Sequence, residues 1–328
     1  MKKRICLFLA CVIFLMPITS CTRPVTKVSD SFFLMDTLIT VTLYAAPDTD
    51  TATILAECRT ILEELDALWS RTREGSDTNR INFAPAGEIA IDPRTDRLIS
   101  KALAVSARTD GAFDITVAPF VALWQECEKT QTLPTDEAIA AAWDIVYKSA
   151  LTTIDGKAVK LYDETQIDLG GIGKGAAVSS LVEYLETCPI EGALISFGSN
   201  VAVVGKKPEG DAFRVAVKNP IDGNDYAKVL EMSEGQVLSV SGDYERYYTI
   251  DGEKYHHIID PQTGYPAKNG LCSVAVICED GALADALSTA LFVMGETKSR
   301  ELYASGAYDF EAIFITSYGI VSTTDGLK

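Results

Sequence analysis

The sequence lacks the excess of positive charge that nucleic-acid-binding proteins carry. Its 328 residues include 29 lysines and arginines against 46 aspartates and glutamates, which gives a net charge of −17. An acidic surface argues against nucleic acid or anionic lipid headgroups as partners. The chain after its first twenty residues also lacks internal repeats, linkers and low-complexity tracts. Its length allows one large domain or two lobes that share an interface.

Cysteine is too sparse and too irregularly spaced for a disulfide framework or a zinc site. The chain has eight cysteines, of which Cys6 and Cys11 fall in an apolar N-terminal stretch and Cys21 follows it. An odd number remains, without metal-ligand spacing. We therefore expect these remaining residues to be buried apolar side chains: Cys58, Cys127, Cys188, Cys272 and Cys278.

The apolar run near the N-terminus is too short to be a permanent membrane span. It covers about 14 residues after a basic start, whereas a spanning helix needs roughly 20. Small residues precede Cys21 and no A-x-A cleavage site lies nearby, which favours a lipoprotein signal over an ordinary cleaved one. We expect residues 1–20 to be the signal peptide, 21–30 a lipidated tether and 31–328 the functional domain. The protein would be exported and held at the extracytoplasmic face of the membrane by its acyl chains alone.

Helices and strands are predicted in separate groups along the chain. Helices are expected at 51–69, 92–108, 135–146, 176–186, 283–294 and 297–305. Strands are expected at 32–46, 111–117, 166–169, most of 193–259, 310–316 and 320–323, with a hairpin at 151–161. Residues 70–91 are polar and rich in turn formers. This grouping favours an α+β fold over regular βαβ alternation.

The densest chemical signal is a glycine-rich stretch at 166–176 that joins a predicted strand to a helix. Glycines let the backbone approach a ligand, the helix N-terminus offers free N–H groups, and Lys174 adds a positive charge, a combination that suits a pyrophosphate. A P-loop is excluded, because that motif needs a glycine at position 168, which is Asp168, and a serine or threonine at position 175, which is Gly175. A Rossmann fingerprint fits Gly171, Gly173 and Ala176 but lacks its βαβ context. A simple glycine-rich turn with an exposed lysine remains an alternative.

A second signal is the pair Asp285 and Thr289, which are four residues apart in a predicted helix. Residues at this spacing share one helix face. A carboxylate and a hydroxyl are hard oxygen ligands of the kind that Mg²⁺ takes. Taken alone, a capping Asp and a Thr bonded to its own backbone is the commoner outcome.

Histidine is scarce, and the only two are adjacent, His256 and His257. A histidine near neutral pKa is a natural general base for a hydroxyl, and a neighbouring carboxylate can orient it. Adjacent residues of a strand point to opposite faces, so only one of the two can face a site. If His257 does so, His256 is expected to be solvated. Two surface histidines without a role are the alternative.

Eight stretches, taken in order, resemble the ApbE family of FAD:protein FMN transferases, once labelled thiamine biosynthesis lipoproteins. They lie at 33–37, 76–82, 111–117, 167–175, 198–200, 241–247, 257–264 and 284–292. Together they cover nearly all of the chain after the signal. The resemblance implies one compact α+β domain with mixed or antiparallel sheets and flanking helices.

The resemblance also implies FAD as the bound substrate and Mg²⁺ as the cofactor. The metal ligands would be Asp285, Thr289 and the backbone carbonyl oxygen of Gly173, where the family usually has alanine. His257, Asp243 and Lys174 would be catalytic. The flavin and nucleotide would be bound by Met35, Asp114, Thr116, Lys174, Gly198, Ser241, Gly242, Arg246, His257, Ile258 and Asp260. Asp36 and Ser199 depart from glycines that are usual in relatives, and the first could alter the loop beside the flavin.

The implied reaction moves FMN from FAD onto a Thr or Ser hydroxyl of an exported redox protein and releases AMP, with His257 as the base. Water in place of that hydroxyl would make the same site an FAD pyrophosphatase. A lipoprotein that only binds FAD is a third possibility. The pair Asp285 and Thr289 argues against it, because a pure binder has no need for a metal on the pyrophosphate.

Overall fold

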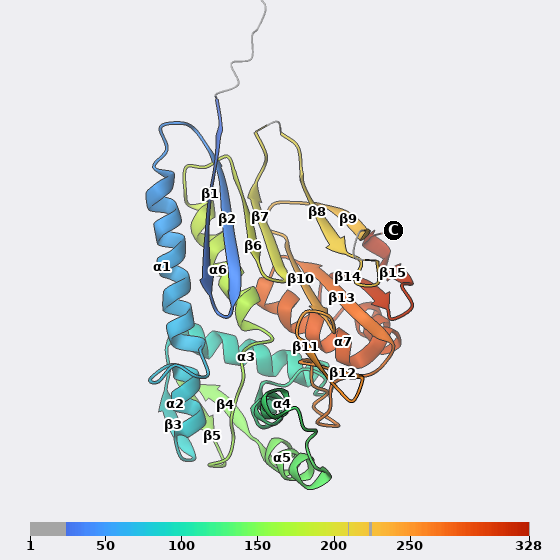
Figure 1. The fold of residues 1–328 in the computed structure, drawn as a ribbon. Helices are drawn as coiled ribbons and strands as arrows, with labels where there is room; N and C mark the ends of the chain where they lie inside the picture. The colour runs from blue at the N-terminus through green and yellow to red at the C-terminus, as the bar shows by residue number, and fades with distance from the viewer. Residues whose placement is uncertain (1–23, 209, 223–224, 328) are drawn as a thin grey trace, which may run out of the picture.

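The computed structural model describes residues 24–208, 210–222 and 225–327 (Figure 1). The expected signal peptide, 1–20, and Cys21 lie outside the described residues. The central sheet has eight strands, and each neighbouring pair is antiparallel. In spatial order they are β1 (Thr26–Leu34), β2 (Thr37–Ala45), β6 (Gly192–Phe197), β7 (Asn200–Gly205), β10 (Val237–Gly242), β13 (Leu271–Cys278), β14 (Glu311–Thr316) and β15 (Val321–Thr323). This antiparallel order confirms the α+β prediction and excludes the Rossmann alternative.

Helices cover one face of this sheet and a two-stranded ribbon covers part of the other. The described helices are α1 (Thr51–Trp69), α2 (Asp77–Phe83), α3 (Pro93–Arg108), α4 (Ala118–Thr130), α5 (Asp136–Lys148), α6 (Gly173–Glu186) and α7 (Gly281–Ala304), of which α4 and α5 pack into a separate core. The ribbon is β8 (Phe213–Lys218) with β9 (Tyr226–Met232). Two smaller sheets, β3 (Gly87–Ala90)–β5 (Lys157–Lys160)–β4 (Leu151–Ile154) and β11 (Tyr247–Ile250)–β12 (Glu253–His256), lie with α4 and α5 at the lower end of Figure 1.

Strand β13 shows why the sheet is covered on both faces. Its eight residues are all buried. Val274 and Val276 pack into the large core beneath α6 and α7, whereas Ala275 and Ile277 pack into a second core under the β8–β9 ribbon. Alternate residues of a strand point to opposite faces, so a continuous apolar strand needs a layer on each side.

The helix boundaries follow the local signals in the sequence. The side chain of Asp50 caps α1 by accepting a hydrogen bond from the N–H of Thr53, and Asp92 caps α3 ahead of Pro93. The two helices expected at 283–294 and 297–305 form one element, α7, with non-helical backbone at Gly295. In the described part of the chain, no helix is long and apolar enough to cross a membrane.

The N-terminal strand prediction was wrong in two respects. Residues 32–46 form a hairpin, because Met35 and Asp36 both adopt left-handed backbone angles (φ 49° and 57°) that reverse the chain between β1 and β2. The first strand also begins at Thr26 and pairs with β2 along its whole length. Residues 26–30, expected to belong to the tether, are therefore part of the central sheet.

Other elements also differ from the prediction. Residues 111–117 form a turn and a 3₁₀ helix (Ile115–Val117) because the Asp114 side chain accepts the N–H of Thr116 and caps it. Residues 166–169 form no strand. Helix α4 was not predicted, and α2 and β3 lie inside the stretch read as polar turns.

Candidate active site

A cavity of about 270 Å³ lies where the N-terminus of α6, the N-terminal part of α7 and the end of β10 meet. We call it the central cavity. The loop before the 3₁₀ helix, the β6–β7 turn and the segment after β12 complete its walls. Most of the residues implied by the resemblance line it: Asp114, Lys174, Gly198, Ser241, Gly242, Arg246, His257, Ile258, Asp285 and Thr289.

Helices α6 and α7 cross at glycines, which brings their functional groups together. A Cβ on Gly175 would overlap the carbonyl oxygen of Gly281 and would lie 2.6 Å from the Cβ of Asp285. The backbone N–H of Gly175 instead donates a hydrogen bond of 2.9 Å to Oδ2 of Asp285. On the same helix face, Oγ1 of Thr289 lies 3.6 Å from where a Cβ of Gly171 would sit. The two predicted side-chain metal ligands, Asp285 and Thr289, therefore lie against the glycine-rich loop.

The Asp285 carboxylate is buried without a charged partner. Only 4% of the residue is exposed, and its other oxygen accepts a hydrogen bond of 3.2 Å from Ser239. No positively charged side chain pairs with it in the part of the chain that the structure describes. A buried carboxylate that has only neutral donors fits a site for a cation. The hydroxyl of Ser241 lies 3.3 Å from that of Thr289 and extends the polar wall.

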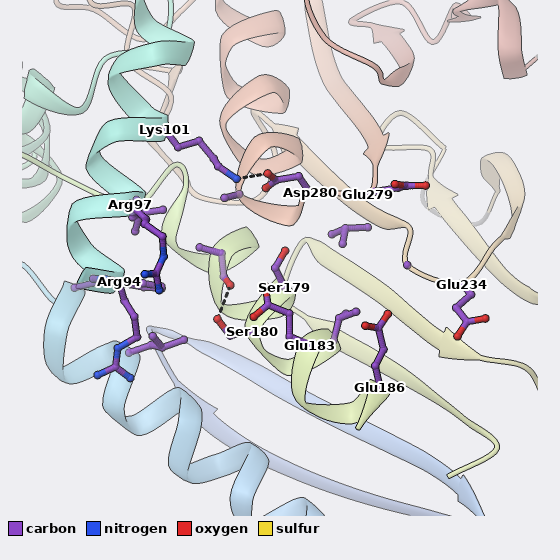
Figure 2. A pocket seen from close by; sticks show the side chains of 18 residues that line it. Arg94, Arg97, Lys101, Ser179, Ser180, Glu183, Glu186, Glu234, Glu279 and Asp280 are labelled. Carbon is purple, nitrogen blue, oxygen red and sulfur yellow. Dashed lines mark hydrogen bonds and ion pairs between the residues drawn. The ribbon is translucent and has the colours of Figure 1, made fainter. Parts of the chain in front are cut away.

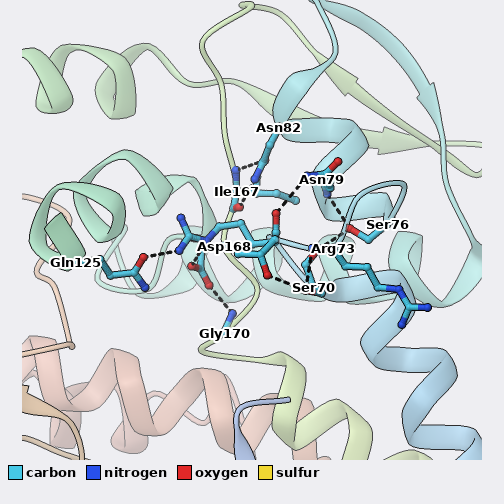
Figure 3. A network of polar contacts seen from close by, with 11 residues as sticks. Ser70, Arg73, Ser76, Asn79, Asn82, Gln125, Ile167, Asp168 and Gly170 are labelled. Carbon is cyan, nitrogen blue, oxygen red and sulfur yellow. Dashed lines mark hydrogen bonds and ion pairs between the residues drawn. The ribbon is translucent and has the colours of Figure 1, made fainter. Parts of the chain in front are cut away.

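The glycine-rich loop is held from outside by a polar network (Figure 3). The amide of Asn82 pairs with both backbone groups of Ile167, donating to its carbonyl oxygen at 2.9 Å and accepting from its N–H at 2.7 Å. This amide thus pairs with the backbone of Ile167 as a neighbouring strand would. One oxygen of Asp168 accepts from the N–H of Gly170, and the other lies 3.3 Å from Nε of Arg71.

Lys174 lies at the mouth of this loop. Its ammonium donates a hydrogen bond of 2.9 Å to the carbonyl oxygen of Gly170. The N–H groups of Gly173 and Gly175 are already used, donating to Leu169 and Asp285. The positive potential that a diphosphate needs therefore comes from the α6 dipole and this ammonium.

His257 lines the central cavity just after the end of β12. Its Nδ1 lies 3.1 Å from the carbonyl oxygen of Arg246, so Nδ1 carries the proton and Nε2 keeps a free lone pair. His257 keeps an exposed surface at the cavity wall, yet desolvation by the protein packed around its ring lowers its pKa to about 4, and the positive charges of Lys174 and Arg246 act in the same direction. The imidazole is therefore neutral near pH 7.

The expectation that His256 would be solvated was wrong. His256 is only 6% exposed, and its ring meets that of Phe292 edge-on. Its Nε2 lies 2.9 Å from the carbonyl oxygen of Ala267, and its Nδ1 accepts from the N–H of Ile258. The strand ends at His256, so strand alternation does not decide where its neighbour points.

Two further contacts shape the cavity walls. The carboxylate of Asp114 accepts hydrogen bonds from the N–H and the hydroxyl of Thr116, and burial raises its pKa. Across the cavity, Nη2 of Arg246 donates to the carbonyl oxygen of Asp36 at 3.1 Å. The tip of the β1–β2 hairpin is thereby held against the segment before β11.

The structure does not bring every predicted residue to the cavity wall. Asp243, expected to be catalytic, pairs with Lys254 at 2.8 Å and is not among the residues that line the cavity. Thr116 does not line the cavity but donates two hydrogen bonds to the carboxylate of Asp114. Asp260 stabilises its own turn by accepting a hydrogen bond from the N–H of Gln262. Met35 and Gly173 lie behind the lining and face each other, since a Cβ on Gly173 would lie 3.9 Å from Cε of Met35.

Several residues that support the site were not singled out from the sequence. Ser239 reaches Asp285, and Arg71 connects Asp168 to Gln125 through a hydrogen bond of 2.7 Å. These contacts join segments far apart in the chain, and no local spacing signals them. Asn82 lies in a stretch that carried the family resemblance, yet nothing in that stretch indicated its partner.

A larger cavity, of about 680 Å³, lies on the outer side of α6 (Figure 2) and does not suit an anionic ligand. Its basic wall on α3 consists of Arg94, Arg97 and Lys101. Arg94 already pairs with carboxylates of Asp92 and Glu64, and Lys101 pairs with that of Asp280. The facing wall is acidic, with glutamates at 183, 186, 234 and 279. Little free positive charge remains there for a diphosphate.

No group of three or more His, Cys, Asp and Glu side chains that could hold a metal occurs among the residues at 24–208, 210–222 and 225–327. The candidate set is of another kind: the carboxylate of Asp285 and the hydroxyl of Thr289 line the central cavity, whereas the third expected donor, the carbonyl oxygen of Gly173, belongs to a residue behind the lining. Hard oxygen donors of this sort, completed by ligand phosphates, are typical of Mg²⁺ sites.

Comparison with known proteins gives a consistent result. The model of the ApbE family matches residues 35–314. The chain is 31% identical over 319 residues to an FAD:protein FMN transferase of Vibrio cholerae, covering 96% of this chain and 93% of that one. It is 32% identical over 280 residues to the FAD:protein FMN transferase of Salmonella typhimurium, covering 82% and 79%.

Solved structures agree with this comparison. The flavin transferase ApbE from Vibrio cholerae superposes with a TM-score of 0.80 at 28% identity, covering 92% of this chain and 97% of that one. The apbE protein from Thermotoga maritima superposes with a TM-score of 0.82 at 30% identity, covering 92% and 98%.

Proposed function

The chain belongs to the ApbE family, and from that premise we propose that its central cavity splits FAD and transfers the FMN half to a protein. The chain is an FAD:protein FMN transferase. The observation that carries this conclusion is the contact between α7 and the glycine-rich loop, because it places a buried carboxylate beside a cradle for a diphosphate. We further propose that the accepting group is a Thr or Ser hydroxyl of an exported redox protein and that the leaving group is AMP.

Mg²⁺ is the proposed cofactor, with Asp285, Thr289 and the carbonyl oxygen of Gly173 as its ligands. The support is the donor set and the buried, unpaired charge of Asp285. Exchange of the usual alanine for glycine at position 173 leaves a backbone ligand in place. When bound, such an ion supplies positive charge to a diphosphate and so favours departure of AMP.

The residues of the chain bind the diphosphate and move the proton. The ammonium of Lys174 and the positive end of the α6 dipole would hold the diphosphate where its charge is neutralised. His257, with Nδ1 fixed on the carbonyl oxygen of Arg246, presents Nε2 as the base that accepts the proton of the attacking hydroxyl. Positioning and charge neutralisation provide most of the rate enhancement in transfers at phosphorus.

We also propose that the protein works as a lipoprotein attached through Cys21 to the extracytoplasmic face of a membrane. Strand β1 begins at Thr26, a few residues after Cys21, and runs to the hairpin tip that contacts Arg246. Nine residues of strand hold that tip about 26 Å from Thr26. The central cavity would therefore open away from the anchor, toward exported proteins.

The first test follows AMP release and covalent flavin transfer together. The purified chain is incubated with FAD and Mg²⁺, with and without an exported flavoprotein in its unmodified form, and flavin fluorescence on the acceptor is read in a denaturing gel. We expect AMP and a fluorescent acceptor, and we expect a metal chelator to abolish both.

Asp285→Ala should abolish the signal, whereas Asp144→Ala provides a matched control. Asp144 lies on the exposed face of α5 and pairs only with Lys148. Intact FAD after long incubation would leave a flavin-binding protein without transferase activity. AMP release into water without any labelled acceptor would favour a pyrophosphatase.

A further inference from the structure

Another cavity, of about 350 Å³, adjoins the central cavity on the side of α4. We call it the side cavity. It lies between α4 and the β11–β12 ribbon, which are neighbours in Figure 1 and are joined by a hydrogen bond of 3.1 Å from the hydroxyl of Tyr248 to the carbonyl oxygen of Trp124. Six of its residues line both cavities: Val121, Gln125, Glu245, Arg246, His257 and Ile259. The two spaces therefore meet at His257.

The chemistry of the side cavity differs from that of the central cavity. The residues found only in the side cavity are Trp124, Glu128, Tyr247, Tyr248 and His256. It has no lysine and no glycine-rich loop, and its one cationic residue, Arg246, belongs to the shared wall. Glu128 and Glu245 give it negative charge, which repels the phosphates of a nucleotide. Its aromatic side chains suit the uncharged or basic flank of a polypeptide.

We propose that the side cavity receives the polypeptide of the acceptor protein and presents its Thr or Ser hydroxyl to His257. This inference rests on the proposed transferase function and specifies where its second substrate binds. The diphosphate of FAD would lie in the central cavity over Lys174, so the attacking oxygen must arrive from another side. The shared wall provides that approach, because Nε2 of His257 is left free there.

The bond changes in this step balance without a further reactant. The acceptor oxygen forms a bond to the FMN phosphorus, the bond from that phosphorus to the bridging oxygen breaks, and AMP leaves with that oxygen. Nε2 of His257 takes the hydroxyl proton. The acidic rim adds a preference, because a basic residue next to the target hydroxyl would be attracted to Glu128 and an acidic residue would be repelled.

Tyr247 provides the sharpest test of binding. Its side chain is 53% exposed, so Tyr247→Ala removes an aromatic contact surface without opening a core. We expect the KM for the acceptor that the wild-type protein labels to rise about fivefold, with the Kd for FAD unchanged. Tyr318→Ala is the matched control, since Tyr318 is 88% exposed and lies at the remote turn between β14 and β15.

Glu128→Lys tests the charge preference. Two versions of the acceptor are compared, one with lysine and one with glutamate next to the modified residue. Wild type should favour the lysine version in kcat/KM, and Glu128→Lys should reverse that order. Glu126→Lys makes the same change of charge on α4 at a residue that does not line the side cavity, and it should keep the wild-type order.

Each other outcome overturns the inference. Weaker FAD binding by Tyr247→Ala with an unchanged acceptor KM would show that the side cavity holds part of the flavin nucleotide. No change in either constant would show that the side cavity is unused. If wild type releases AMP but labels no acceptor, the proposed transferase function itself fails, and this result is separate from the other two because it needs no variant.

Discussion

The carboxylate of Asp285 accepts a hydrogen bond of 2.9 Å from the backbone N–H of Gly175. This contact joins the N-terminal part of α7 to the first turn of α6, and the close approach depends on the glycines that both helices carry where they cross. The candidate metal ligands and the glycine-rich loop therefore form one rigid unit. Their relative position depends on backbone packing more than on any flexible side chain.

Gly175→Ala should disrupt this unit. The added methyl group would overlap the carbonyl oxygen of Gly281, so the helices must move apart, at a cost of about 1–3 kcal/mol in the free energy of unfolding. We expect a lower melting temperature and a loss of AMP release of at least about tenfold. Gly173→Ala is the control, since its nearest atoms would lie at 3.8 and 3.9 Å. A fully active Gly175→Ala protein would contradict the role given to this crossing.

The pKa of His257 gives a prediction that needs no substrate. The protein has two histidines, and burial lowers the pKa of His256 as well as that of His257, the latter to about 4. Proton NMR of the imidazole signals should show both midpoints below 6.5. His257→Gln removes one signal and assigns the other. A His257 midpoint at 6.5 or above would contradict the low-pKa environment.

The lowered pKa values of the histidines also determine how the free energy of unfolding changes with pH. The unfolded histidines bind protons near pH 6.5, whereas folded His257 does so only near pH 4, so unfolding takes up protons between these values. The free energy of unfolding should therefore fall as the pH drops from about 6.5 to 4. Urea unfolding at several pH values measures this, and His257→Gln should show a smaller fall.

Thr289 should affect metal dependence more than folding. Thr289→Val keeps the shape of the side chain and removes the hydroxyl, so we expect the Mg²⁺ concentration for half-maximal AMP release to rise about tenfold or more. Thr289→Ser keeps an oxygen at the same place and should stay within about threefold of wild type. Equal metal dependence of the valine variant and wild type would remove Thr289 from the ligand set.

Asn82 should be essential for the loop that ends at Asp168. Asn82→Ala leaves both backbone groups of Ile167 without partners in a buried place, which should lower the free energy of unfolding by about 2–4 kcal/mol. Asn79→Ala is the matched control on the same helix, because the Asn79 amide makes only one long contact, at 3.4 Å to the carbonyl oxygen of Arg71. Chemical denaturation compares the two. Equal stability would mean that the loop does not depend on this amide.

These contacts show what the sequence could and could not predict. Regular periodicity and capping residues predicted α1 and α3 correctly, since these depend on neighbours along the chain. Residues 166–169 were predicted to form a strand, because the sequence does not show that the backbone of Ile167 pairs with the side chain of Asn82. The buried state of His256 was missed because it depends on the end of β12 and on Phe292.

The residues of the candidate site were predicted from the sequence better than the contacts that hold them in place. The family resemblance indicated many of the residues that line the central cavity, because those residues lie in the eight sequence stretches that match the family. It did not indicate that Asp243 would pair with Lys254, nor that Arg71 would hold Asp168. The pair of Arg71 and Asp168 joins segments far apart in the chain and so leaves no spacing pattern in the sequence.

The lipid anchor is the last prediction, and it concerns location separately from activity. Cys21→Ser removes the thiol that would carry the acyl chains, so we expect the protein to move from the membrane fraction to the soluble fraction after export. AMP release from FAD should be unchanged, because β1 separates Thr26 from the hairpin tip at the central cavity by about 26 Å. Cys188→Ser, a change of the same kind within the folded domain, should leave the protein at the membrane. A Cys21→Ser protein that stays bound to membranes in detergent partitioning would show that something other than this cysteine holds it there.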